Sequence, residues 1–176
     1  MTADEKRKQV VKAYKSIIGR NKYSKQLRDY CMTPYSDGCF YSDCSSSICY
    51  CYKASGIGIN IMNTVGMFTS SRLTTVDVVI KNGQIVNTDV LRVGDILLFA
   101  GTDLSRWYAQ CVGHAEMVAD IDVSGVILYG HGSGVPTAKD MKAPCRSRYN
   151  AKTKTPIGNK GIVKVVRIIN DGDTFV

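Results

Sequence analysis

A cysteine stands near the start of a predicted helix in the segment YSDCSSSI, residues 41–48. Ser42 and Asp43 are good helix N-caps, and Gly56 marks the end of the helical pattern. Cys44 therefore falls in the first turn, where free backbone N–H groups and the helix dipole stabilise a thiolate. Cysteines in such settings have pKa values lowered to about 3.5–7.5, so the sequence predicts a nucleophile that is also the most oxidant-sensitive thiol.

A thiolate nucleophile needs a base, and the chain contains two histidines. His114 lies near the start of one predicted strand and His131 at the end of the next, with a turn predicted at Ser124-Gly125. An antiparallel hairpin places both histidines near one end, where we expect them to meet. A cysteine on a helix, a histidine on a strand and a polar group beside it form a catalytic triad.

Two alternatives to this triad remain open. Glu116, two residues from His114 on the same strand face, competes with His131 as the group that orients the base. Cys44 can also be a small buried apolar residue, and each histidine an ordinary core or surface group.

The cysteine count does not predict a metal centre. The chain has seven cysteines, an odd number that leaves at least one thiol unpaired: Cys31, Cys39, Cys44, Cys49, Cys51, Cys111 and Cys145. The sequence lacks a pair of CxxC units, the spacing typical of a structural zinc site. Cys49 and Cys51 are two residues apart in a predicted helix, so they point to nearly opposite sides and cannot bind one ion together. We expect reduced thiols, no metal and no cofactor.

The charge balance favours polyanionic partners. The chain has 23 Lys and Arg against 15 Asp and Glu, a net charge of +8. Nucleic acid, an anionic membrane or a bacterial wall with phosphate polymers would each suit this charge. No apolar run approaches the roughly 18 residues of a membrane helix, so no membrane span is expected. The charged N-terminal residues are followed by no apolar signal region, which predicts synthesis in the cytoplasm.

The elements that position these residues are helical first and β-stranded later. Residues 3–18 have apolar side chains at helical spacing and a lysine-rich opposite face, which predicts an amphipathic helix. A polar loop, residues 21–42, separates it from the Cys44 helix, and a basic irregular stretch is expected over 139–160. The predicted strands cover residues 76–80, 85–86, 96–100, 114–121, 126–131 and 162–169, with an Asn82-Gly83 hairpin turn. This order predicts an α+β fold in one domain, residues 1–176, with the helix of residues 1–20 as part of it.

Four segments, in order, resemble the NlpC-type cell-wall cysteine peptidases between about residues 17 and 134. SDCSSSICYCYKASG is similar to the nucleophile helix of that family, and LRVGDILLFAG to its Pro-Gly-Asp-leading strand, with Val93 where proline is usual. VGHAEMVAD resembles the histidine strand, and LYGHGSG the strand of the third catalytic group. The resemblance implies a papain-like α+β fold, with the nucleophile helix packed on an antiparallel sheet of about five strands.

The resemblance also implies roles for individual residues. Cys44 would be the nucleophile, His114 the general base and His131 the group that orients His114. Tyr23 falls where the family has a tyrosine that helps the Cys44 backbone N–H to form the oxyanion hole, although the usual glycine pair is absent and Tyr35 or Tyr41 are alternatives. Asp43 and Ser45 match positions that bind substrate, while Ser46 replaces a usual glycine.

The implied reaction is hydrolysis of an amide bond in peptidoglycan stem peptides, after γ-D-glutamate and before the diamino acid. The expected partner is bacterial peptidoglycan rather than nucleic acid, and the expected context is a phage-type lysin that reaches the cell wall after release from the cytoplasm. Three other functions remain open: an N-acetylmuramoyl-L-alanine amidase, a thiol acyltransferase of related fold, and a non-catalytic wall- or nucleic-acid-binding module with a structural Cys44.

Overall fold

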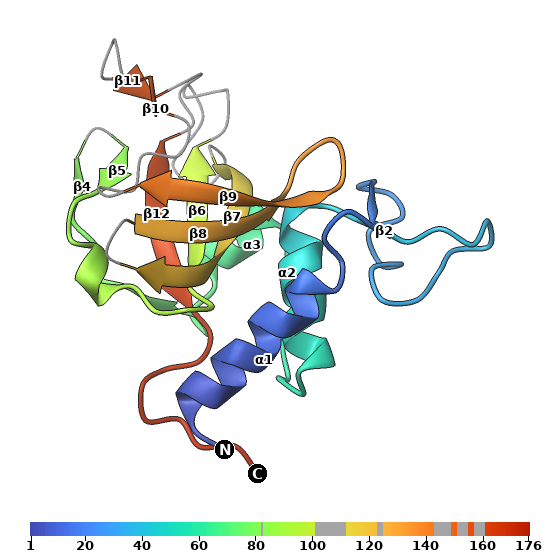
Figure 1. Ribbon diagram of the computed structural model, residues 1–176, viewed down its shortest axis with the longest axis horizontal. Helices are drawn as coiled ribbons and strands as arrows, with labels where there is room; N and C mark the ends of the chain where they lie inside the picture. The colour runs from blue at the N-terminus through green and yellow to red at the C-terminus, as the bar shows by residue number, and fades with distance from the viewer. Residues whose placement is uncertain (82, 101–111, 123–124, 143–148, 151–154, 157–160) are drawn as a thin grey trace.

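The computed structural model describes the chain except for residues 82, 101–111, 123–124, 143–148, 151–154 and 157–160. Its fold is mixed α+β, with helices α1 and α2 early in the chain and a large sheet formed later (Figure 1). Trp107, Cys111 and Cys145 lie outside the described residues.

Three α-helices occur in the described chain, and the two longest were predicted. α1 (Ala3–Lys15) begins with a capping box between Thr2 and Glu5. α2 (Cys44–Ala54) begins directly after Asp43. The short α3 (Thr64–Thr69) was not predicted, because it has only six residues and buries only Met67. None of the described helices is long and apolar enough to cross a membrane.

Six strands of the described chain form one antiparallel sheet in the order β3-β12-β6-β7-β8-β9. The prediction of about five strands was thus one short. The strands are β3 (Thr74–Thr75), β6 (Ile96–Ala100), β7 (Val112–Asp122), β8 (Gly125–His131), β9 (Pro136–Lys142) and β12 (Ile162–Arg167).

The additional long strand is β9, which begins before the stretch predicted to be irregular and extends into it. It pairs with β8 along its whole length, from His131–Pro136 to Gly125–Lys142. Because β9 lies at the edge of the sheet, its proline and its polar sequence are compatible with pairing on one side only. The local sequence therefore does not predict β9, which is stabilised by its pairing with β8.

Smaller elements complete the described chain. The strands β1 (Lys22–Tyr23) and β2 (Tyr41–Ser42) form a short parallel pair within the predicted loop. The predicted hairpin around residue 82 is present as β4 (Ile80–Lys81) and β5 (Gln84–Ile85). The remaining pieces are the 3-10 helix η1 (Thr88–Val90) and the pair β10 (Tyr149–Asn150) and β11 (Thr155–Pro156).

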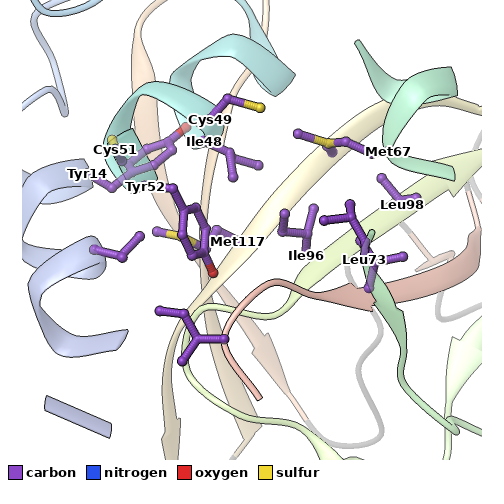
Figure 2. Close-up of a cluster of buried hydrophobic side chains, with 14 of the residues drawn as sticks. Tyr14, Ile48, Cys49, Cys51, Tyr52, Met67, Leu73, Ile96, Leu98 and Met117 are labelled. Atoms are coloured by element: carbon purple, nitrogen blue, oxygen red, sulfur yellow. The ribbon is translucent and has the colours of Figure 1, made fainter. Parts of the chain in front are cut away.

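Hydrophobic side chains fill both faces of the sheet. On one face, side chains from α1 and α2 such as Tyr14 and Ile48 pack with Ile96, Leu98 and Met117 of the sheet (Figure 2). On the other face, Val76, Ile85 and Leu91 pack in a second cluster that includes Leu97 and Phe99. Burial on both faces explains why β6 is a continuous apolar run.

A buried ion pair links the start of β6 to the end of β12. Arg167 donates to both carboxylate oxygens of Asp95, from Nε at 2.7 Å and from Nη2 at 2.8 Å. Asp95 is fully buried. The two-point contact compensates a charge that would otherwise be expensive to bury.

We expect the substitution Arg167→Met to lower the free energy of unfolding by roughly 3–5 kcal/mol, because it leaves the Asp95 charge buried without its partner. Urea denaturation at pH 7 measures this change. Arg92→Met is the matched control: the Arg92 side chain is 41% exposed and its ion pair with Asp171 is superficial, so its loss should stay below about 1 kcal/mol. Equal losses in the two variants would contradict a dominant role for the buried pair.

Candidate active site

Cys44 is the first residue of α2, as the sequence predicted. The carboxylate of Asp43 accepts hydrogen bonds from the backbone N–H groups of Ser45 (3.1 Å) and Ser46 (2.8 Å), and the Ser46 hydroxyl accepts the Asp43 N–H at 2.9 Å. This capping box fixes where the helix begins. As a first-turn residue, Cys44 has a backbone N–H without an intrahelical acceptor.

The Cys44 thiol is buried, with a residue exposure of 8%. Burial raises its pKa to about 11, the Asp43 carboxylate acts in the same direction, and the N–H groups of Ala115 and Ser45 and the charge of Arg28 only partly oppose them. The expectation of a lowered pKa for Cys44 was therefore wrong. Loss of hydration outweighs the helix dipole here, because a thiolate in an apolar environment loses most of its solvation.

The thiol lies beside strand β7, one residue from the predicted base. The last register pair between β7 and β8 is Glu116–Gly130, whereas β7 stays paired with β6 as far as Val112. Within this part of β7, the backbone N–H of Ala115 interacts with the Cys44 thiol. Cys44 therefore contacts the residue that follows His114 in β7.

His114 is paired with Glu116. Its Nε2 lies 3.0 Å from Glu116 Oε1, the His114 side chain is 12% exposed, and that of Glu116 is fully buried. Alternation along β7 puts both side chains on one face. Gly130 lies opposite Glu116 in β8, and a Cβ atom at Gly130 would come within 2.8 Å of Glu116 Cγ. The glycine therefore makes room for the Glu116 side chain.

His131 has different partners from those predicted. Its Nδ1 lies 3.0 Å from the Ser42 hydroxyl and its Nε2 lies 3.2 Å from the carbonyl of Gly134. Since a carbonyl only accepts, Nε2 carries the proton and Nδ1 accepts from Ser42. The Ser42 hydroxyl in turn accepts from the Asn21 side-chain amide at 3.0 Å. Burial lowers the pKa of His131, so the ring is neutral at pH 7.

The two histidines share one end of the hairpin but form no hydrogen bond with each other among the described contacts. Gly130 is paired with Glu116 and so shares the face of Glu116 and His114, whereas His131 is the next residue of β8 and points to the other face. Directly opposed residues share a face, so His131 projects from the face opposite to that of His114. Among the described residues, no hydrogen bond joins His114 to Cys44 or to His131, whereas Glu116, the alternative to His131 in the sequence analysis, contacts His114.

Tyr23, the predicted oxyanion-hole residue, lies near Cys44. Its ring meets the His131 ring edge-on, with centroids 5.6 Å apart. Burial raises the pKa of Tyr23, and the nearby thiol of Cys44 and carboxylate of Asp43 raise it further. The alternative Tyr41 instead donates its hydroxyl to Asp37 at 2.6 Å.

Arg28 is a site residue that the sequence did not reveal. Its Nη2 donates to the Ser45 hydroxyl (3.0 Å) and to the carbonyl of Met62 (2.9 Å), and its Nε lies 3.3 Å from Asp43 Oδ2. Asp43 and Ser45, both predicted to bind substrate, are thus joined by one guanidinium. Nothing in the local sequence marks Arg28 among the basic residues of the loop.

No group of three His, Cys, Asp or Glu side chains in the described part of the chain is arranged to hold a metal ion. Comparison of the sequence with family models and with curated proteins finds no match. The assignment of function therefore depends on the residues and geometry described above.

Thiol accessibility gives a direct test of this geometry. Among the described cysteines, Cys39 alone is not buried, and it lies 3.0 Å from the Lys22 ammonium. We expect iodoacetamide at pH 7 to alkylate Cys39 at least tenfold faster than Cys44, and Cys44 to accelerate as the pH approaches its pKa of about 11.

Peptide mass mapping assigns each adduct, so that the remaining cysteines do not confuse the result. Cys51, which is buried and has a pKa raised well above the usual value, is the matched control for slow reaction. Rapid alkylation of Cys44 at pH 6 would show instead that its thiol is ionised.

Proposed function

We propose that this protein is a cysteine peptidase with a papain-like arrangement of helix and sheet, which hydrolyses an amide bond in peptidoglycan stem peptides. The observation that carries the proposal is the position of the Cys44 thiol: it lies at the start of a buried helix and against the β7 backbone beside His114. The 3.0 Å contact between His114 and Glu116 adds a base with an orienting carboxylate.

The chemistry follows from a thiol that is protonated at rest. With a pKa of about 11, roughly one Cys44 in ten thousand is ionised at pH 7. His114 therefore takes the thiol proton as Sγ attacks the substrate carbonyl, and Glu116 stabilises the imidazolium that forms. The Cys44 N–H and the Tyr23 hydroxyl stabilise the oxyanion.

The acyl-enzyme forms when the carbon–nitrogen bond breaks and the leaving amine takes the proton from His114. Water, deprotonated by the same histidine, then attacks the thioester, and the thiol is restored. The chain's net charge of +8 favours a wall rich in phosphate and carboxylate groups. Action on the wall after phage-type release is the context that we propose.

A second candidate is a non-catalytic binding module in which Cys44 is structural. The observation that favours it is the burial of Cys44 together with the hydrogen-bonded state of both His131 nitrogens. In that case Cys44 would serve only as a small apolar residue of the α2 start.

We expect Cys44→Ala to abolish hydrolysis of purified cell walls, since the thiol forms the covalent intermediate, while the melting temperature changes little. New amine termini identified by mass spectrometry measure the activity and report the bond that is cut. Cys39→Ser, which alters an accessible thiol outside the site, should keep full activity. Hydrolysis at the wild-type rate by Cys44→Ala would contradict Cys44 as the nucleophile, absence of hydrolysis by the wild-type protein would support the binding module, and release of L-alanine amino groups would identify an amidase.

We also expect Glu116→Gln to reduce kcat about 100-fold or more, because the amide stabilises the imidazolium poorly. His131→Ala should mainly reduce stability, since it removes the partner of Ser42 and leaves the segment before Cys44 less well held. Steady-state kinetics and thermal unfolding of both variants distinguish these effects. A larger kcat loss in a fully folded His131→Ala protein would assign the orienting role to His131.

A further inference from the structure

Lys22 and Cys39 form a close pair outside the candidate active site. The Lys22 ammonium donates to Cys39 Sγ at 3.0 Å, although the two residues are 17 positions apart in the chain, and the contact is exposed to solvent. A small oxidant in solution can therefore reach the sulfur. Once oxidised to a sulfenic acid, a cysteine condenses with a nearby nitrogen to form a sulfur–nitrogen bond.

The backbone fixes both members of the Lys22–Cys39 pair. The Lys22 N–H donates at 2.9 Å to the carbonyl of Phe40, the residue that follows Cys39. The Cys39 carbonyl accepts from the Tyr35 N–H at 2.8 Å, and the Cys39 N–H donates to Asp37 Oδ1 at 2.8 Å. The amine and the sulfur thus meet without a rearrangement of the chain, which is the condition for an efficient intramolecular reaction.

The surroundings of the pair keep Lys22 charged. The pKa of Lys22 is raised, chiefly by its hydrogen bond to Cys39 and then by the charges of Cys39 and Tyr41. Its Nζ also lies 5.9 Å from the centre of the Tyr41 ring. An ammonium that donates to a sulfur atom is a counter-ion for the thiolate, which is the form of a cysteine that peroxides oxidise.

Among the described cysteines, Cys39 alone is accessible. Cys31, Cys44, Cys49 and Cys51 are buried, so none of these four thiols is exposed to form a disulfide with an oxidised Cys39. The group already in contact with its sulfur is the nitrogen of Lys22.

We propose that Lys22 and Cys39 form a reversible sulfenamide cross-link when the protein meets a peroxide. The inference is independent of the proposed function. The Cys39 thiolate attacks hydrogen peroxide, the O–O bond breaks, and the hydroxide that leaves takes a proton from the Lys22 ammonium. The free amine then attacks the sulfenic acid sulfur, the S–O bond breaks and a second water leaves. The pair loses two hydrogens, and one peroxide is reduced to two waters.

The cross-link would close the loop of residues 22–39, which projects away from the sheet (Figure 1). It would also tether this loop beside Tyr23 and protect Cys39 from irreversible oxidation to the sulfinic acid. A thiol reductant reverses it: one thiol attacks the Cys39 sulfur and releases the Lys22 amine. A second thiol then restores Cys39 and leaves the reductant as its disulfide.

The test treats the folded protein with hydrogen peroxide at pH 7, alkylates the remaining thiols and maps the tryptic peptides by mass spectrometry. We expect a cross-linked peptide that joins Lys22 to Cys39, is lighter than its two parts by two hydrogens, and disappears with dithiothreitol. Lys22→Arg keeps a cation beside the sulfur but removes the primary amine. In this variant the cross-link should fall at least about tenfold, and irreversible sulfinic acid at Cys39 should rise by a similar factor.

Lys25→Arg is the matched control, because Lys25 is an exposed lysine of the same loop and its replacement should leave the cross-link unchanged. Melting temperatures establish that each variant is folded. A disulfide between Cys39 and another cysteine, sulfinic acid at Cys39 without a cross-link, or a Cys39 that stays unmodified in the wild-type protein would overturn the inference. A cross-link of unchanged yield in folded Lys22→Arg would overturn it as well.

Discussion

The cap that Asp43 forms on α2 is the interaction on which the site depends. Its carboxylate accepts free backbone N–H groups in the first turn of α2, which fixes where the helix begins and thereby the position of Cys44. The same carboxylate pairs with Arg28, so that the helix start and the preceding loop are joined electrostatically. Because Asp43 is 5% exposed, its interactions are little weakened by solvent. A small buried carboxylate thus holds together the first turn of α2, which carries Cys44, and the Arg28 guanidinium.

Burial has two opposite consequences for this site. It strengthens the contacts among Asp43, Arg28 and Ser45, but it also keeps the Cys44 thiol protonated. A nucleophile of this kind needs a base at the moment of attack, rather than a stable thiolate formed beforehand. This need gives the His114–Glu116 pair its importance in the proposed mechanism, since a buried carboxylate is well suited to stabilise a transient imidazolium.

The register of β7 and β8 decides which residue contacts His114. The side-chain period of a strand is two, so a difference of one residue moves a side chain to the other face. Here Gly130 lies opposite Glu116, and its lack of a side chain leaves space for the carboxylate. His131, one residue further, projects to the opposite face and binds Ser42. It thereby stabilises the segment that leads into α2 and lies beside Tyr23.

The sequence by itself determined the α+β order of elements, the start of α2 and the position of Cys44 in its first turn, because caps, turns and hydrophobic periodicity act over a few residues. It also indicated that Glu116 shares a face with His114. Only the tertiary structure decided that Cys44 is desolvated, that β9 pairs with β8, that the two histidines project from opposite faces and that Arg28 reaches Asp43 and Ser45. Burial, register and long-range contacts depend on how distant segments pack, and no local pattern specifies them.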